Sequence, residues 1–368
     1  MQKKLLATVV ASLVAGQAMA LEVYNDDTTS LSIGGRIGVT TNDDNKEMGN
    51  DSSRINFKFG HKLSSELTAI GVAEWSFDPT AKSGENVFGN RLGYVGLDHS
   101  ELGALTAGKQ WSVYSDVANW ASDNLLFNGG IAIGIYDGLN GDGGIHGTGR
   151  ADDAFAYRNT FGGLNIGLQY QLKSSDTRTL KDADQIDYFQ QWNRKTGASQ
   201  IAVSYDLPMG LSVGYTYSQA RFNKTTQGDT KPDHINHAGD SAKAHVFGVK
   251  FDHEDLYVGF NYGEFKHHAS LKSGLIAEKA KATDLYASYA LSSLVDGLAV
   301  FGAYQNLDFD KDASGAKTKE ELKIASIGVK YQTGPMMFGV QYDQNDSKNA
   351  AGKKENDNIF SFNARYYF

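Results

Sequence analysis

Charged side chains at alternating positions are the residues of this sequence best placed to do chemistry. In "LSIGGRIGVT", Arg36 falls on the polar side of the alternation, and in "RINFKFG" Arg54 and Lys58 do the same. Arg158 follows this rule in "AFAYRNTF", and Glu74 does so in "TAIGVAEWSF". Fixed charges of this kind are poor nucleophiles, but a row of them can attract, repel or align ions.

Groups that carry covalent or metal chemistry are sparse. The chain has Cys 0, which excludes thiol catalysis and disulfides, and no G-x-S-x-G motif marks a serine nucleophile. His234, His237, His267 and His268 are expected in long polar loops as ordinary titrating surface groups. The segment "YDGLNGDGG" lacks the closing glutamate of a calcium-binding loop. We therefore expect no enzyme, no metal site and no cofactor.

The elements that must position these charges are strands. Alternation with period two recurs along the chain, whereas helical periodicity is hard to find. Tight turns such as "LPMG" alternate with long polar connections. The pattern predicts an all-β fold with 16 strands, at 31–40, 53–62, 66–77, 87–98, 103–110, 152–161, 163–173, 198–206, 210–220, 243–252, 255–265, 283–292, 297–309, 321–332, 335–343 and 357–368.

The N-terminal stretch "MQKKLLATVVASLVAGQAMA" combines two lysines, an apolar run and an Ala-Met-Ala sequence. This pattern predicts a cleaved signal peptide over residues 1–20 and one exported domain over residues 21–368. The apolar run is too short for an anchor that spans a bilayer. Without Lys3 and Lys4, the 35 basic residues fall to 33 against 43 acidic ones. This balance disfavours nucleic acid as a partner.

Two architectures fit many alternating strands, a soluble β-sandwich and a transmembrane β-barrel. Strands of about 10 residues, an even strand number and alternating short and long connections favour the barrel. We therefore expect a 16-stranded antiparallel transmembrane β-barrel, in which the apolar face meets lipid and the polar face lines a lumen. An arginine that faces lipid is costly, so the charged positions are expected in the lumen. Pairing with carboxylates to rigidify the wall is the alternative role.

The stretch from Trp111 to Gly149 is the longest one without clear alternation. It carries Trp120, Phe127 and Ile133 among other apolar residues, which is too apolar a composition for a disordered surface loop. A loop of this length in a compact fold needs a role. We expect this stretch, about 111–149, to fold inward and pack inside the barrel.

Several segments resemble the trimeric general-diffusion porins of Gram-negative outer membranes. They are "GNRLGYVGL", "AGKQWSVYSD", "AFAYRNTFGGLNIGLQYQ" and the terminal "NARYYF", and the resemblance covers essentially all of residues 1–368. In that family, strands five and six flank a long loop that folds into the barrel and narrows the pore. The resemblance implies a basic cluster that faces this loop, formed by Arg36, Arg54, Arg91 and Arg158, with Lys109 at a further basic position.

Two parts of the expected constriction need separate comment, the position of Arg91 and the tip of the long loop. Arg91 lies in "GNRLGYVG", where alternation places Leu92 and Tyr94 on the opposite face. Family members often carry a Pro-Glu-Phe-Gly-Gly tip on the loop, whereas residues 126–130 read Leu-Phe-Asn-Gly-Gly. The acids that remain in position to serve in the constriction are Asp116 and Asp123.

The resemblance implies an outer-membrane channel for passive diffusion of ions and small hydrophilic solutes, assembled as a homotrimer. It also implies that the terminal motif is read by the barrel assembly machinery, through Phe362, Tyr366 and Phe368. Lipopolysaccharide and outer-membrane lipid are further expected partners, and the acidic loops favour a weak cation preference. The alternative function is a substrate-selective sugar channel, which would need inward aromatic residues such as Tyr257 and Tyr286. A barrel enzyme or an adhesin is less favoured.

Overall fold

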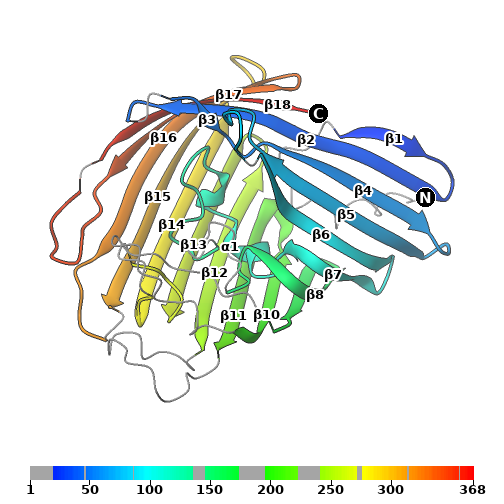
Figure 1. Cartoon of the computed structure of the whole chain (residues 1–368), viewed down its shortest axis with the longest axis horizontal. Coiled ribbons are helices and arrows are strands. Elements are labelled where there is room, and N and C mark those ends of the chain that lie inside the picture. The colour runs from blue at the N-terminus through cyan, green and yellow to red at the C-terminus, as the bar shows by residue number, and fades with distance from the viewer. Residues whose placement is uncertain are drawn as a thin grey trace.

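The strands of the chain form one closed ring, with the short helix α1 (Ser115–Ala118) inside it (Figure 1). The computed structural model describes residues 20–44, 47–85, 87–135, 146–173, 195–222, 241–271, 276–312, 315–355 and 357–368. The ring closes where β18 (Ile359–Tyr367) pairs antiparallel with β2 (Thr29–Asn42). Within the described residues, no helix is long and apolar enough to cross a membrane.

The other strands of the ring follow in chain order, and each pairs antiparallel with its neighbours. They are β4 (Arg54–Lys62), β5 (Leu67–Phe77), β6 (Phe88–His99), β7 (Gly103–Trp111), β8 (Arg150–Phe161), β9 (Leu164–Gln171), β10 (Lys195–Asp206), β11 (Leu211–Phe222), β12 (Ala242–His253), β13 (Leu256–Lys266), β14 (Lys279–Ala290), β15 (Leu298–Lys311), β16 (Glu321–Thr333) and β17 (Met336–Asn345). Two short 3-10 turns complete the set, η2 (Ser122–Asn124) and η3 (Pro208–Gly210).

Two short strands flank β2 and do not belong to the ring. In the described part of the chain, β1 (Leu21–Asn25) and β3 (Gly49–Asn50) pair only with β2. Setting them aside from the 18 strands of the sheet leaves 16 antiparallel strands in the ring. Each of these corresponds to one predicted strand. The sequence did not reveal β1 and β3 because segments of five and two residues are too short to show alternation.

The two faces of the strands differ in polarity. In β12, Ala244 and Val246 are buried on the inside, while Phe247 is 46% exposed on the outside. Phe155 of β8 and Ile327 of β16 are likewise exposed, apolar and outward. A soluble sandwich would bury this apolar face against a second sheet. An apolar outside around a polar inside is the arrangement of a barrel in lipid, so the predicted fold class is confirmed.

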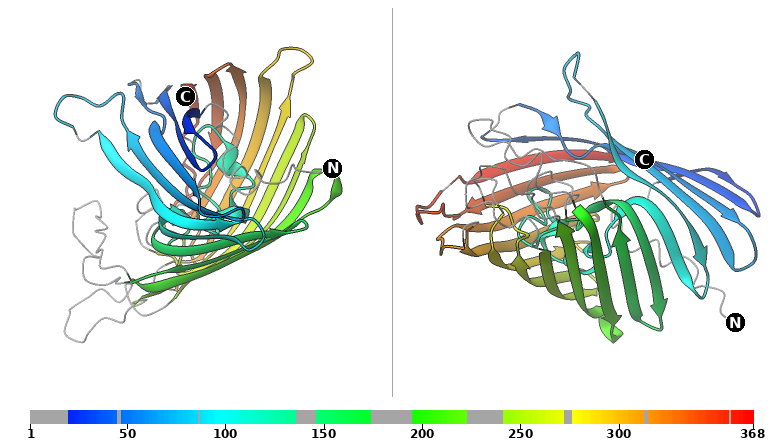
Figure 2. Two further views of the ribbon diagram at one scale, coloured as in Figure 1. Left: turned by 90° about the vertical axis from the view of Figure 1, so that its right-hand side faces the viewer. Right: turned by 60° about the horizontal axis from the view of Figure 1, so that its bottom comes forward.

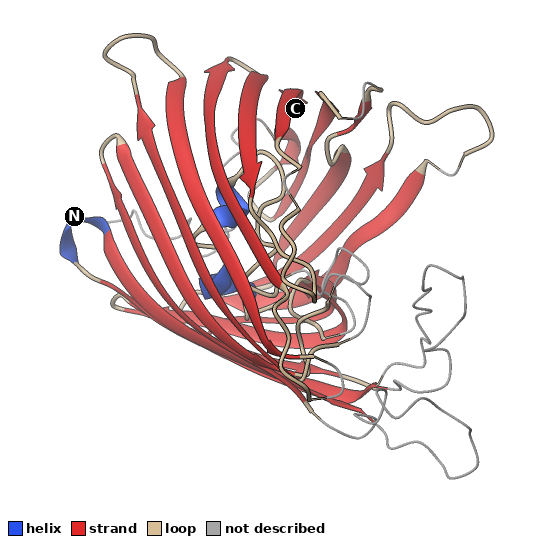
Figure 3. Cartoon of the chain, turned by 90° about the vertical axis from the view of Figure 1, so that its left-hand side faces the viewer, coloured by secondary structure: helices blue, strands red, loops and turns tan. Residues whose placement is uncertain are grey.

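The segment between β7 and β8 crosses the inside of the ring (Figure 2, Figure 3). We call residues 112–135 and 146–149 the inner loop; it includes α1 and η2. Glycines make room for it on the wall. A Cβ at Gly214 would lie 2.7 Å from the Trp120 ring, and one at Gly248 would lie 2.8 Å from the Val117 side chain. The loop therefore packs directly onto the strand backbones of β11 and β12.

Strand β6 departs from the expected alternation at Arg91. A register shift lies between Glu74 and Trp75 of β5, so that Glu74 is opposite Leu92 and Trp75 is opposite Asn90 of β6. Leu92 is buried on the same side as Glu74, and the expectation that Leu92 and Tyr94 face away from the polar side was wrong. Arg91 is the extra residue of this bulge. Its side chain still reaches the inside, because the bulge locally cancels the alternation.

The chain ends at the seam of the ring. Phe360, Phe362 and Tyr366 are exposed on the outer face of β18, whereas Asn363 is fully buried on the inner face. Phe368 continues the pairing beyond β18: its backbone N–H donates to the Gly35 carbonyl oxygen at 3.2 Å and its own carbonyl oxygen accepts from the Gly35 N–H at 2.8 Å. The aromatic row at the C-terminus is thus the outer face of the last strand.

Candidate functional site

A cluster of paired charges lies on the inner face of β2 and β4. Arg36 and Arg54 are directly opposite one another in the register of these strands, and like charges in this position repel. Two buried carboxylates offset the repulsion. The distance from Arg36 Nη2 to Asp51 Oδ1 is 3.9 Å, and that from Arg54 Nε to Glu74 Oε2 is 3.9 Å.

Each of these carboxylates also has a second, closer partner. Arg91 Nε donates to Glu74 Oε1 at 2.7 Å, and Arg365 Nη2 donates to Asp51 Oδ1 at 2.9 Å. The structure therefore brings together the predicted residues Arg36, Arg54, Glu74 and Arg91, with four guanidinium groups around two carboxylates. Close pairing is what a buried carboxylate requires. These groups form wall salt bridges on the inner face, and their expected role in lining the constriction stays a prediction.

Asp51 and Arg365 were not among the expected constriction residues. Arg365 also donates to the Leu126 carbonyl oxygen of the inner loop at 3.2 Å, so it connects the charged cluster to the loop. Alternation does place Arg365 inward together with Asn363, but it does not show that Arg365 pairs with Asp51. Asp51 lies in the turn between β3 and β4, where no periodicity marks the direction of a side chain.

Two further predicted basic residues, Arg158 and Lys109, form separate ion pairs. Arg158 donates twice to Asp116, at 2.7 Å from Nε and 3.1 Å from Nη2, and once to the Trp111 carbonyl oxygen at 3.0 Å. Lys109 Nζ lies 3.0 Å from Asp152 Oδ1. The fork-shaped pairing of Arg158 with Asp116 fixes the start of the inner loop against β8.

Two predicted residues lie outside these pairs. Lys58 is on the inner face of β4, four residues from Arg54, which places it about 13 Å farther along the strand. Asp123 is half-buried in η2 of the inner loop. Both face the interior of the ring, but neither belongs to the group of four arginines.

Side chains of the wall satisfy the backbone of the inner loop, as buried peptide groups require. Tyr257 of β13 donates to the Trp120 carbonyl oxygen at 2.7 Å, and Gln341 of β17 donates to the Phe127 carbonyl oxygen at 3.1 Å. The Ser122 hydroxyl donates to Asp284 Oδ2 at 2.5 Å. The loop is therefore held against the wall at several points from β13 to β18.

The family model for Gram-negative porins matches residues 35–368. The chain belongs to the Gram-negative porin family. It is similar to outer membrane porin F of Xenorhabdus nematophila, with 31% identity over 353 residues that cover 90% of this chain and 89% of that protein. It also resembles Salmonella typhi OmpF, solved in complex with daunomycin, with a TM-score of 0.71, 20% identity, and coverage of 95% of this chain and 100% of the other. The trimer form of OmpT from Vibrio cholerae gives a TM-score of 0.65 at 17% identity, over 93% of this chain and 100% of the other.

Family membership and the ring architecture agree on the kind of protein. This porin is a protein of the outer membrane and forms a water-filled channel for passive diffusion of ions and small hydrophilic solutes. Such conduction needs a polar lumen of limited width and fixed charges along it, which the inner face supplies. The family is one of channels, not of enzymes.

The two inward tyrosines expected of a sugar channel do not form an open track for sugars. Tyr257 and Tyr286 do face inward, and their ring centroids are 6.0 Å apart. However, Tyr286 is only 2% exposed, packed on Phe301 and beneath Lys330, whose Nζ lies 3.0 Å from the Tyr286 hydroxyl. A sugar needs an accessible ring face for stacking, so these rings support the inner loop instead.

The expectation of surface histidines was wrong for two of them. His267 and His268 are 7% and 1% exposed. Both lie in the connection from β13 to β14, and His268 packs against Gly134 of the inner loop. His234, His237 and the segment 136–144 lie outside the described residues. Within the part of the chain that the structure describes, no group of three or more His, Asp or Glu side chains is placed to hold a metal ion.

Proposed function

We propose that the inner loop and the four-arginine cluster together form the constriction of this channel. The observation that carries the proposal is Arg365, since one side chain bonds both Asp51 of the cluster and Leu126 of the loop. This link supports placing the charged wall and the loop at one level of the lumen. The proposed lining residues are Arg36, Arg54, Lys58, Glu74, Arg91, Lys109, Asp116, Asp123 and Arg158, with Asp51 and Arg365 added.

The charge of this constriction favours anions. Four guanidinium groups face two carboxylates in the cluster, and the loop tip at 126–130 adds no acid. Fields are screened over about 8 Å at physiological ionic strength, so the charges at the narrowest point act most strongly on a passing ion. The acidic charge of the whole chain, which favoured cations, counts less there.

Recordings in planar bilayers test both parts of the proposal. The purified porin should give stepwise single-channel conductance, and its reversal potential in a salt gradient should have the sign of anion preference. Absence of conductance would contradict the channel function itself. A cation-selective reversal potential would leave the channel function intact and contradict the proposed charge of the constriction.

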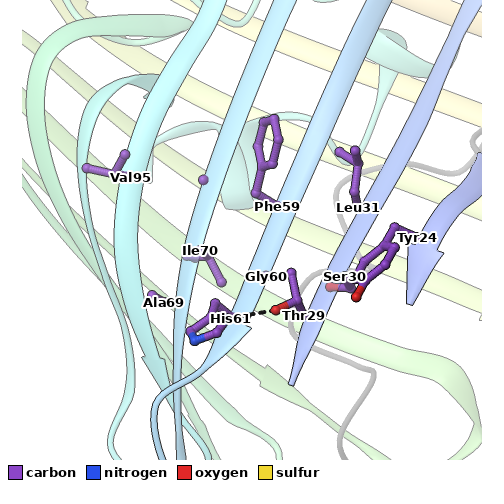
Figure 4. A pocket seen from close by; sticks show the side chains of 11 residues that line it. Tyr24, Thr29, Ser30, Leu31, Phe59, Gly60, His61, Ala69, Ile70 and Val95 are labelled. Atoms are coloured by element: carbon purple, nitrogen blue, oxygen red, sulfur yellow. Dashed lines mark hydrogen bonds between the residues drawn. The ribbon is translucent and has the colours of Figure 1, made fainter. Parts of the chain in front are cut away.

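We propose that the porin assembles as a homotrimer through the outer face of β2, β4, β5 and β6. A hollow of about 590 Å³ lies on this face, and Figure 4 shows Phe59, Ile70 and Val95 around it. Its floor carries small residues, Gly60 and Gly71. Val95 and Phe59 are 66% and 50% exposed, and a large apolar hollow suits close packing against a second copy. The trimer form of the Vibrio cholerae relative supports this stoichiometry.

Lipopolysaccharide fits another part of the outer face. Lys243, Lys266 and Lys279 are directly opposite one another on β12, β13 and β14. Their neighbours Ala244 and Phe265 are buried on the inside, so the three lysines point outward. They lie at the ends of strands joined by the long connections. Lys279 Nζ is 3.8 Å from Asp310 Oδ2, and a row of like charges is further stabilised by an anionic partner. The phosphates of lipopolysaccharide supply one.

The ends of the chain are proposed to carry the export and assembly signals. Residues 1–20 would be removed as a signal peptide, which leaves Leu21 at the start of β1. Phe362 and Tyr366 are 40% and 44% exposed on the outer face. Together with Phe368 they would present an aromatic row to the barrel assembly machinery before the seam closes.

A further inference from the structure

Lys330 lies on the inner face of β16 and contacts the inner loop through its ammonium group. Its Nζ donates to the Asn124 carbonyl oxygen at 2.8 Å and to the Tyr286 hydroxyl at 3.0 Å. Asn124 is the last residue of η2, and a carbonyl group at the end of such a turn has no partner within the turn. A lysine of the wall therefore supplies the hydrogen bond that the turn itself cannot make.

Two aromatic rings hold this ammonium group in place. Its Nζ is 4.9 Å from the Phe301 ring centroid and 5.4 Å from that of Tyr286, and the two rings stack at 6.0 Å. A cation over the face of an aromatic ring is attracted to it, and more strongly where water is excluded. The wall leaves room for the lysine stem, since Gly339 and Ala299 are directly opposite Lys330 on β17 and β15.

The charge of Lys330 is not neutralised by a carboxylate. Among the described residues, its Nζ contacts a carbonyl oxygen, a hydroxyl group and two rings, and no Asp or Glu side chain forms an ion pair with it. Arg365 differs, because it is bound to Asp51. Lys330 is half-buried, so it places a fixed positive charge at the edge of the lumen, beside the inner loop.

Lys330 and Arg365 hold the same short stretch of the inner loop. Arg365 donates to the Leu126 carbonyl oxygen at 3.2 Å, two residues after the Asn124 carbonyl oxygen that Lys330 binds. The Leu126 side chain packs on Gly339, where a Cβ would lie only 2.4 Å from it. Two cations and a close backbone contact thus fix residues 124–126 against β16, β17 and β18.

We propose that Lys330 is a positioning residue of the constriction and that its unpaired charge contributes to the anion preference. This inference rests on the constriction proposed above. Losing a hydrogen bond from a charged donor shifts the equilibrium of such a contact about tenfold or more. Without the ammonium group, the stretch around Asn124 should leave the wall more often, while Ser122 keeps its bond to Asp284. Each departure would alter the current through the lumen.

Three variants separate the position of the loop from the charge of the lumen. K330M keeps an unbranched stem and removes the ammonium group, whereas K330R keeps a positive charge and N–H donors. K250M is the matched control: Lys250 is also on the inner face, its Nζ is 5.1 Å from the Trp120 ring centroid, and it has no hydrogen bond to the loop among the described residues. Recordings in planar bilayers give the closing frequency and the reversal potential of each variant.

A spin label on η2 reports the position of the loop without any conduction. The chain has Cys 0, so D123C supplies a single thiol beside Asn124. The mobility of the label is compared in D123C with and without K330M or K250M. Chemical rescue gives a further readout, since n-propylammonium replaces the atoms that K330A lacks and a purely structural gap would not respond to it in this way.

For K330M, we expect brief closures about ten times as frequent as in the wild type, a more mobile label and a weaker anion preference. K330R should resemble the wild type, and n-propylammonium should restore the quiet current of K330A. K250M should weaken the anion preference without raising the closing frequency or the mobility of the label.

Wild-type closures and an unchanged label in K330M would overturn the positioning role. So would an equal rise in K250M, because loss of any lumen charge would then be sufficient. A cation-selective wild type would contradict the proposed charge of the constriction, and the label would still decide whether Lys330 holds the loop. If K330M does not fold, K330A is refolded with and without n-propylammonium, and no gain in folded barrel from the amine would overturn the inference.

Discussion

Trp120 of the inner loop and Gly259 of β13 meet backbone to backbone: a Cβ at position 259 would overlap the Trp120 carbonyl oxygen. The same oxygen accepts the hydrogen bond from the Tyr257 hydroxyl at 2.7 Å. The loop and the wall are thus in contact with no side chain between them. The position of the loop inside the barrel depends on a residue without a side chain at this point.

Gly259→Ala should therefore displace the inner loop. The added methyl group cannot be accommodated by a side-chain rotation, because the atom it meets belongs to the backbone. We expect a loss of about 2 kcal/mol, typical of overpacking, and an altered single-channel conductance. Gly302→Ala is the control, since a Cβ there would meet its nearest neighbour at 3.5 Å. Equal conductance in both variants would show that the loop does not limit the flow.

The charge of the constriction can be changed without breaking its closest ion pairs. Arg36 and Arg54 are 3.9 Å from their carboxylates, while Arg365 and Arg91 hold the same carboxylates at 2.9 Å and 2.7 Å. Replacing Arg36 and Arg54 together by Gln should shift the anion-to-cation permeability ratio toward cations by roughly threefold. Stability should change little, because each carboxylate keeps its closer partner.

Reversal potentials in a salt gradient measure this shift in the permeability ratio. Two further variants serve as comparisons. Replacing Lys243 and Lys266 by Gln removes the same charge from the outer face and should leave the reversal potential unchanged. Arg91→Gln should instead lower the stability of the barrel by about 3 kcal/mol, since Glu74 is 4% exposed and loses its 2.7 Å partner. If the Arg36 and Arg54 variant keeps the wild-type reversal potential, these arginines do not line the constriction.

Alternation predicted the ring strands well because each strand alternates several times between a lipid-facing and a lumen-facing side chain. Lipid outside and water inside sort every second residue, so the 16 ring strands and the inward direction of Arg36 and Arg54 followed from local sequence. The bulge at Arg91 did not, because a single extra residue leaves no periodic trace. Asp51 was missed for a related reason, since it lies in a turn and acts through Arg365, more than 300 residues away.

The buried histidines show a second limit of sequence reasoning. A stretch such as His267-His268 after a strand looks like an exposed polar loop. Its burial depends on the inner loop, which reaches it from more than 100 residues earlier in the chain, through Gly134. Non-local packing of this kind changes a surface group into a buried one without any change in local pattern.

The outer hollow gives a direct test of the trimer. Ala69 lines it, and Ala69→Trp should fill the space that a second copy would occupy. We expect the variant to fold as a barrel but to migrate as a monomer in unheated detergent gels and by light scattering. Ala287→Trp is the control on β14, where the neighbouring Leu285 and Tyr289 are exposed to the outside. A trimer of normal stability in the Ala69 variant would place the subunit contact elsewhere.

The outward lysine row predicts recognition of phosphate on the outer-leaflet glycolipid. Replacing Lys243, Lys266 and Lys279 by Gln should lower the affinity for lipid A roughly hundredfold, at about 1 kcal/mol for each lysine near an anionic surface. Thermal stabilisation on adding lipid A reports the affinity, and dephosphorylated lipid A should give no such difference between variant and wild type. The control replaces the exposed loop lysines Lys317, Lys319 and Lys353. An equal loss in that control would mean that overall charge, not the row, attracts the lipid.

The C-terminal residue should matter more for assembly than for conduction. Deleting Phe368 removes two backbone hydrogen bonds to Gly35 at the seam, a loss of about 2 kcal/mol, together with the last aromatic ring of the terminal motif. The constriction residues are untouched, so channels that do form should keep the wild-type conductance. We expect several-fold less heat-modifiable barrel in the outer membrane, measured against Phe368→Tyr, which keeps both the backbone pairing and the ring. Normal assembly of the truncated chain with altered conductance would reverse these roles, because Phe368 would then act on the pore and not on the closing of the ring.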